Sequence, residues 1–164
     1  MRGSMSWEDL WPLLLNGTLE TVYMVALASL FTVLIGLPLG VLLFLTGSPQ
    51  LRRRPLLYGV TALLVNVLRS VPFIILMIVL IPLTLALMGT SLGVRGAILP
   101  LVVGAAPFYA RLVETALREV DRGVIEASQA MGATTAQLVF KVLLPEARPG
   151  LIAGATVTTI ALIG

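Results

Sequence analysis

The sequence contains no cysteine and no histidine, and only 12% of its 164 residues are charged. Without these two residue types the chain has no disulfide, no thiol nucleophile, no imidazole base and no Cys or His metal site. Soluble domains carry about 25% charged residues. The composition therefore excludes most enzyme mechanisms and a small water-soluble core.

Hydrophobic residues make up 58% of the chain, and its mean hydropathy is +1.03. This indicates an integral membrane protein, with one domain over residues 1–164. The net charge is +3, but the basic residues are scattered at the ends of apolar runs, where orientation in the membrane explains them. We therefore expect membrane lipid, and not nucleic acid, as a partner.

The first apolar run predicts a membrane span over residues 21–45. Trp7 and Trp11 lie one helical turn apart in the amphipathic residues 1–17, which predicts an interfacial helix ahead of this span. Residues 47–49 (Gly-Ser-Pro) should break the helix of the span. The three arginines at 52–54 then place this end on the cytoplasmic side.

A second span is expected to begin near Leu56 and to end before residue 89. It contains the polar residues Asn66, Arg69 and Ser70. An arginine at the membrane centre costs about 2.5–3.5 kcal/mol on insertion scales. Two explanations remain open. Either Arg69 lies deep and lines a wet cavity or pairs with a partner, or residues 56–70 follow the inner interface and Pro72 opens the true span.

A third span is expected over residues 97–113, after an outside turn at residues 89–95. The chain then returns to the cytoplasm at its next basic residues, which are Arg111, Arg118, Arg122, Lys141 and Arg148. A fourth span starts at Pro149, but residues 149–164 reach only about 24 Å of a core about 30 Å thick. We expect the N-terminus outside and the domain incomplete within this fourth span.

Two of the predicted spans contain glycine and proline, which favour close helix packing or a bend. Gly36 and Gly40 have the spacing of close helix packing, although Pro38 between them also fits a simple kink. Gly104 and Pro107 are expected to bend the third span, which is tolerated where neighbouring helices or water satisfy the freed backbone groups.

Residues 118–148 form the longest amphipathic, charge-bearing stretch, and they predict two short helices beneath the bundle. Asp121 is a candidate N-cap of the first helix, and Gly132 ends it at a position that requires a left-handed backbone. Thr134 and Gln137 form a capping box for the second helix. That helix should end at Pro145 and bury Leu138, Val139, Val142 and Leu143.

On a helical wheel of residues 121–131, polar and apolar side chains separate. The less polar side carries Val124, Ala127, Ser128 and Met131, and the other carries Arg122, Glu126 and Gln129. The small residues would let the backbone of another protein come close. Composition alone also permits an amphipathic hairpin that lies on the membrane.

The spacing of this stretch resembles the EAA loop of bacterial ABC-importer permeases. The matching positions are Glu126, Ala127, Ser128, Gly132, Val142, Leu144 and Pro145. The family often carries proline where this chain has Asp121, which affects how the first loop helix begins. Residues 66–76, 89–93 and 104–111 are similar to permease subunits of methionine importers, and the resemblance covers residues 16–164.

The resemblance implies an all-α, polytopic helix bundle of the type I ABC-importer permease kind. It implies a homodimer with a second permease copy, two cytoplasmic ATPase subunits and an external substrate-binding lipoprotein, in the bacterial inner membrane. ATP and Mg²⁺ would bind the ATPases, and this chain would bind no cofactor or metal and catalyse no reaction. The loop would couple ATP hydrolysis to methionine uptake through Glu126, Ala127, Ser128, Gly132, Ala133, Leu144 and Pro145.

The translocation pathway is less well defined by the sequence. Asn66, Arg69 and Ser70 are candidates to line it, with packing and topology as equal alternatives. Three other functions remain open: a permease for another polar amino acid, a channel or carrier that works without an ATPase, and a structural membrane anchor. The chain has no phosphate-binding Gly-x-x-x-x-Gly-Lys-Ser/Thr sequence, as expected where a partner hydrolyses ATP.

Overall fold

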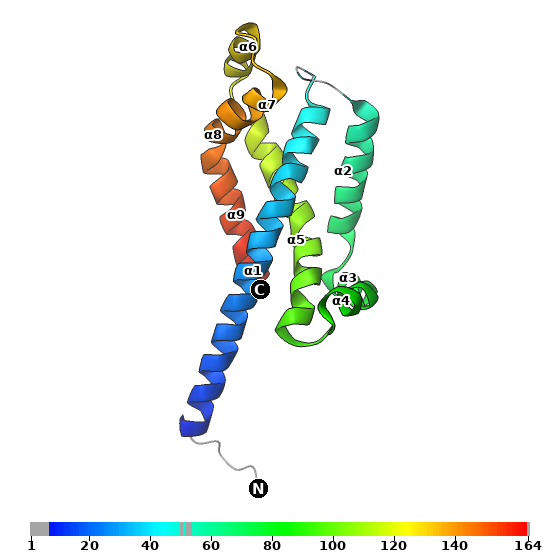
Figure 1. Ribbon diagram of the computed structural model, residues 1–164, viewed down its shortest axis with the longest axis vertical. Coiled ribbons are helices and arrows are strands. Elements are labelled where there is room, and N and C mark those ends of the chain that lie inside the picture. The colour runs from blue at the N-terminus through cyan, green and yellow to red at the C-terminus, as the bar shows by residue number, and fades with distance from the viewer. Residues whose placement is uncertain (1–6, 50, 52–53, 164) are drawn as a thin grey trace.

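A computed structural model describes residues 7–49, 51 and 54–163, and every regular element within them is helical (Figure 1). The elements are α1 (Trp7–Gly47), α2 (Pro55–Ser70), α3 (Phe73–Val79), α4 (Ile81–Met88), α5 (Gly93–Arg118), α6 (Arg122–Ala130), α7 (Thr135–Leu138), the π-helical turn η1 (Val139–Leu143), α8 (Leu144–Glu146) and α9 (Arg148–Ile163). The predicted cytoplasmic residues Arg52 and Arg53 lie outside the described residues, as do residues 1–6.

The first helix is longer than the sequence analysis expected. The predicted separate interfacial helix is wrong, because α1 runs without a break through 41 residues, about 62 Å at 1.5 Å per residue. The polar residues between the two predicted segments fit inside the helix, since Thr18 and Thr21 donate their hydroxyls to the carbonyls of Leu14 and Gly17. The predicted break is confirmed, because α1 ends at Gly47.

The centre of the bundle is α5, with α1 and α9 packed closely against it (Figure 1). A Cβ atom on Gly36 would lie 2.9 Å from the Ala106 carbonyl oxygen, and one on Gly40 would lie 2.5 Å from that of Ala110. The close-packing role predicted for these two glycines is therefore confirmed. Beside α1, Gly150 of α9 approaches Ala116 of α5, where a Cβ would lie 2.8 Å from the alanine methyl.

The predicted second span is three helices. α2 runs beside α1 and α5, and the chain then bends by 105° into α3 at residues 71–72 (Figure 1). The explanation in which Pro72 opens the true span is wrong. α3 and α4 have 7 and 8 residues and each reaches only about 10–12 Å. The bend follows from Pro72, whose ring forces the preceding residue out of the helical region.

By length and hydropathy, α1 and α5 can each cross a membrane, and the bent pair α2–α3 can form a third crossing. α9 has 16 residues and begins at Arg148, one residue before the predicted Pro149. The C-terminal end of α1, the start of α2 and the segment α6–α8 lie at one end of the bundle, whereas α3 and α4 lie toward the other (Figure 1).

Candidate coupling site

The first loop helix, α6, begins and ends where the sequence predicts. The Asp121 carboxylate accepts hydrogen bonds from the backbone N–H groups of Gly123 (2.7 Å) and Val124 (3.3 Å), which confirms the N-cap. Gly132 has φ +81°, a left-handed conformation that L side chains rarely adopt. Its N–H donates to the Gln129 carbonyl at 2.9 Å and closes the turn. The reversal after α6 is therefore built on this glycine.

The capping box of the second loop helix is also confirmed. The Thr134 hydroxyl accepts from the backbone N–H of Gln137 (3.3 Å), and the Gln137 side-chain oxygen accepts from the backbone N–H of Thr134 (2.9 Å). These reciprocal bonds satisfy two donors that the first turn of α7 would otherwise leave without partners. The start of α7 is thus fixed locally.

The predicted end of this helix at Pro145 is wrong. Helical turns continue through α8 to Glu146, and helix resumes at Arg148. A proline inside an α-helix clashes with the carbonyl four residues earlier. Here the wider π turn η1 immediately precedes α8 and places Pro145 in the first turn of the following α-helix. The π turn therefore lets the loop run into α9 without a sharp break.

The loop is packed onto the bundle by a continuous apolar core. This core joins α1 and α5 to α6–α8 through Phe44, Tyr109, Val113, Ala116, Leu117, Val120, Ile125, Leu138, Val139, Leu143 and Ala147. Three of the four residues predicted to be buried in the second loop helix are buried, and Val142 is half-buried. The loop is therefore fixed to the end of α5.

The predicted apolar side of α6 differs from the side that the bundle covers. Ile125 and Ser128 are buried, whereas Val124, Ala127 and Met131 are exposed, Met131 at 82%. The buried stripe is rotated by about one residue from the wheel, because Ile125 is part of the core that joins α6 to α5 and the second loop helix. An apolar side chain, Met131, consequently faces outward at the end of the helix.

The predicted coupling residues fall into two groups. Glu126, Ala127 and Gly132 are exposed, Ala133 is half-buried, and Ser128 is buried with its hydroxyl on the Val124 carbonyl at 2.7 Å. A shallow hollow of about 370 Å³ between α6 and the second loop helix is lined by Ser128, Met131, Gly132, Ala133, Gln137, Lys141 and Val142. Leu144 and Pro145 lie apart from it, in α8. Glu126, Ala127 and Gly132 are thus accessible on the loop, Ser128 is covered, and Leu144 and Pro145 lie in the turn that leads to α9.

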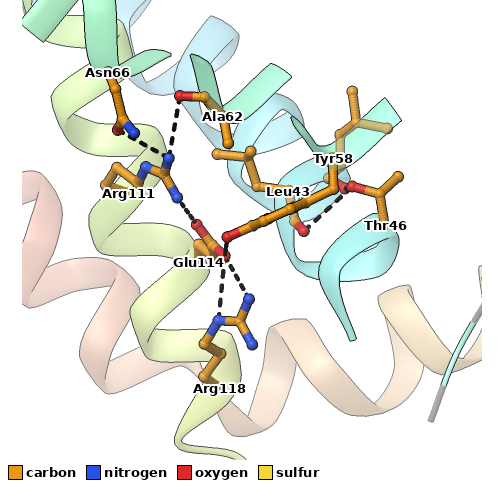
Figure 2. A network of polar contacts seen from close by, with 9 residues as sticks. Leu43, Thr46, Tyr58, Ala62, Asn66, Arg111, Glu114 and Arg118 are labelled. Carbon is orange, nitrogen blue, oxygen red and sulfur yellow. Dashed lines mark hydrogen bonds and ion pairs between the residues drawn. The ribbon is translucent and has the colours of Figure 1, made fainter. Parts of the chain in front are cut away.

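A buried ionic network, which the sequence analysis missed, lies where α2 faces the last two turns of α5 (Figure 2). Glu114, 4% exposed, accepts from Arg111 (2.7 Å), from Arg118 (2.7 and 3.2 Å) and from the Tyr58 hydroxyl (3.3 Å). Arg111 also donates to Asn66 Oδ1 at 2.9 Å and to the backbone carbonyl of residue 62 at 3.3 Å. The sequence signal for this network was the helical spacing of Glu114, three residues after Arg111 and four before Arg118, which places the three side chains on one face of the helix.

The three candidate pathway residues do not converge on one cavity. Asn66 pairs with Arg111, and Ser70 donates to the backbone carbonyl of Asn66 at 2.8 Å. The Arg69 guanidinium lies over the Phe108 ring, 5.7 Å from its centre, within the range of a cation–π contact. Of the three, Arg69 alone lines a cavity of about 250 Å³, with Leu68, Val71, Phe73, Leu76, Gly104 and Phe108.

No group of three or more acidic, His or Cys side chains within the described ranges is arranged to hold a metal ion. The outer side of the loop presents an exposed carboxylate at Glu126, the small residues Ala127 and Gly132, and one exposed methionine, Met131.

The arrangement of the helices matches proteins of known role. The family described as "Binding-protein-dependent transport system inner membrane component" matches residues 36–164. The D-methionine transport system permease protein MetI of Escherichia coli (strain K12) is 52% identical over 160 residues, which cover 98% of this chain and 73% of that protein. The methionine import system permease protein MetP of Bacillus subtilis (strain 168) is 54% identical over 156 residues, which cover 95% and 68%.

Solved structures agree with this match. A chain of the MetNI methionine ABC transporter in inward-facing conformations superimposes with a TM-score of 0.93 and 52% identity, over 98% of this chain and 74% of that one. An amino acid ABC transporter with histidines shares the fold, with a TM-score of 0.73 at 20% identity. From the helix order, the exposed loop and these matches, we conclude that this chain belongs to the family of inner membrane components of binding-protein-dependent transport systems.

Proposed function

We propose that the chain is the membrane-spanning permease subunit of an ATP-driven importer for methionine. The observation that carries the proposal is the segment α6–α8, which is exposed on its outer side and packed on its inner side against the last turns of α5. Identity above 50% with methionine permeases supports the substrate. A second copy of the chain, two ATPase subunits that hold ATP and Mg²⁺, and an external binding lipoprotein complete the assembly.

In this proposal α6 is the coupling helix. Glu126 makes polar contacts with an ATPase subunit, Ala127 permits close approach of its backbone, and Gly132 fixes the turn to α7. Ile125, Leu138 and Leu143 are 2% exposed or less. Burial of each such side chain is worth about 1.5–3 kcal/mol. A force on α6 therefore moves the end of α5 instead of detaching the loop.

The orientation follows from the charges. Arg118, Arg122, Lys141 and Arg148 lie at the same end as α6–α8, and Arg95 lies near the start of α5 at the other end. Because short loops rich in Lys and Arg stay in the cytoplasm, we place α6–α8 in the cytoplasm and the start of α1 outside.

The cavity beside Arg69 is a candidate stage of the translocation pathway. Its lining is apolar apart from the Arg69 guanidinium, so it offers one cation for a carboxylate and aromatic rings for an apolar side chain. A thioether sulfur makes favourable contacts with aromatic rings, which favours methionine over a polar amino acid. Asn66 and Ser70 would contribute through the position of α2, since both already have partners.

The test is the substitution Gly132→Val in the complete complex, reconstituted in vesicles with its ATPase and binding protein. A β-branched residue at φ +81° is strained by about 1–2 kcal/mol or more. We expect Gly132→Val to insert and assemble but to lose most ATP-driven uptake of labelled methionine. The matched control is Gly132→Asn, because asparagine tolerates the left-handed region. Undiminished uptake by Gly132→Val would contradict the coupling role, and uptake of another amino acid in place of methionine would contradict the substrate.

A further inference from the structure

The contact between α2 and α5 is a column of polar groups. Tyr58, Ala62 and Asn66 follow one another at four-residue spacing along α2, and they face Arg111 and Glu114 of α5 (Figure 2). We call the contacts among Tyr58, the Ala62 carbonyl, Asn66, Arg111, Glu114 and Arg118 the polar ladder. It extends over two turns of each helix.

Glu114 is the centre of this ladder. Its side chain is 5% exposed, one carboxylate oxygen accepts from Arg111, and the other accepts from Arg118 and Tyr58. It lies within a helix long and apolar enough to cross a membrane. Ionisable residues in such a segment are costly and are retained where they have partners and a task.

Other attachments of α2 are few. Its apolar contacts to the bundle are a small cluster around Leu43, Val65 and Ala110 and the Tyr58 ring against Gly47 of α1. A Cβ on Gly59 of α2 would meet nothing within 4 Å, whereas the packing glycines of α1 and α9 meet α5 at 3.1 Å or less. α2 ends at the 105° bend of residues 71–72. α2 is therefore held to α5 mainly by the ladder.

The ladder also has an unused donor. Arg111 Nε is buried and has no hydrogen-bond partner. A buried donor without an acceptor is unfavourable, so a displacement of α2 that brings an acceptor to Nε would improve the pairing of Arg111. Arg111 therefore keeps one donor that can bond a new acceptor when α2 shifts.

The two ends of the ladder lie at the two sites of the proposed function. Arg118 is the last residue of α5, three residues before Asp121, the N-cap of the coupling helix α6. Asn66 lies one turn before Arg69, which contacts Phe108 at the candidate pathway cavity. A shift of α5 at its loop end is consequently passed to α2 through the groups that bind Glu114.

We propose that Glu114 is a positioning residue that transmits the movement of the coupling helix to α2 and thereby moves Arg69 relative to Phe108. This inference rests on the proposed function, since it assigns a route between the coupling loop and the pathway. The reaction at the ATPase does not involve Glu114, which contacts neither nucleotide nor substrate in this role.

The experiment uses the complete complex in vesicles and measures two rates, ATP hydrolysis and uptake of labelled methionine. The variant Glu114→Gln keeps the shape of the side chain but removes the charge that holds two arginines. Coupling between sites is typically worth 5–150-fold, so we expect methionine imported per ATP hydrolysed to fall about fivefold or more, with copurification of the ATPase unchanged. The matched control is Thr61→Val on α2, because the Thr61 hydroxyl bonds only its own helix, at the Leu57 carbonyl.

A second variant keeps the proposal testable if Glu114→Gln does not insert. Tyr58→Phe combined with Asn66→Ala removes two of the hydrogen bonds between α2 and α5 and leaves Glu114 paired with both arginines. It should also lower the ratio of uptake to hydrolysis, as Thr61→Val should not. An unchanged ratio in whichever variant inserts overturns the role of Glu114. Failure of the unsubstituted complex to import methionine overturns the proposed function instead, so the two failures are distinguishable.

Discussion

The two sides of α5 are built differently. α1 and α9 contact it through Gly36, Gly40, Gly150 and Gly154. At each of these glycines an added Cβ would lie 3.1 Å or less from an atom of α5. α2 contacts it through hydrogen bonds to the ion-paired residues of α5: the Tyr58 hydroxyl donates to Glu114, and Arg111 donates to Asn66 and to the Ala62 carbonyl (Figure 2). Steric contacts between backbones have one arrangement, whereas hydrogen bonds can exchange partners. The difference suggests a fixed unit of α1, α5 and α9, and an adjustable α2.

The largest effect is expected on the fixed side. Gly40→Ala places a Cβ 2.5 Å from the Ala110 carbonyl oxygen and from Val113, so helices α1 and α5 must separate. Overpacking of this kind costs about 1–3 kcal/mol, and a backbone contact belongs at the upper end. The loss is measured as the free energy of unfolding by SDS in mixed micelles. The matched control, Gly17→Ala in the same helix, meets nothing within 4 Å and should not destabilise; because alanine is the better helix former, it should raise the free energy of unfolding by about 0.5–1 kcal/mol.

A smaller loss of unfolding free energy is expected when Arg111, the more buried arginine of the polar ladder, is replaced. Arg111→Ala removes an ion pair and two bonds to α2, and the Arg111 side chain is only 20% exposed. We expect a loss of about 2 kcal/mol, below the 3–5 kcal/mol of a fully buried pair because Arg118 still pairs with Glu114. Arg118→Ala should cost about 1 kcal/mol or less, since that side chain is 43% exposed. Equal costs would contradict this gradient of burial.

A glycine-to-alanine substitution in α2 should raise the free energy of unfolding, whereas Gly40→Ala in α1 should lower it. Gly59 in α2 is exposed and has no atom within 4 Å of an added Cβ. Because alanine is the better helix former, Gly59→Ala should raise the free energy of unfolding by about 0.5–1 kcal/mol. Destabilisation in the same SDS titration would mean that α2 packs more tightly than the comparison supposes.

The smallest effect is expected at the edge of the ladder. Tyr58→Phe deletes one hydrogen bond of 3.3 Å to Glu114 and leaves the ring in place against Gly47. Hydrogen bonds between membrane helices average about 0.6 kcal/mol in double-mutant cycles, so the change should be of that size. In a cycle with Arg111→Ala, the two effects should be non-additive, since both residues bind Glu114. Full additivity would show that the contacts do not act as one ladder.

The coupling loop was the part of the chain that the sequence described best. The N-cap at Asp121, the left-handed Gly132 and the capping box at Thr134 and Gln137 all involve groups within four residues of each other. Their geometry is fixed by local hydrogen bonds and backbone sterics, so residue types at a given spacing suffice to predict it. The roles of the exposed residues, Glu126 among them, stay a prediction until a partner is bound.

The tertiary structure decided what depends on distant residues. Asn66 and Arg111 pair across 45 residues, and Tyr58 and Glu114 across 56, so no local pattern specified either contact. The chain continues as helix through Pro145 because a π turn, packed against the core, precedes it. Which side of α6 is buried depends on the core residues that α6 meets in the packed bundle. Hydropathy and capping set which segments are helices and where the loop lies. Which helix touches which, and through glycine or through charge, is a property of the packed bundle, because burial and pairing energies exist only once the helices meet.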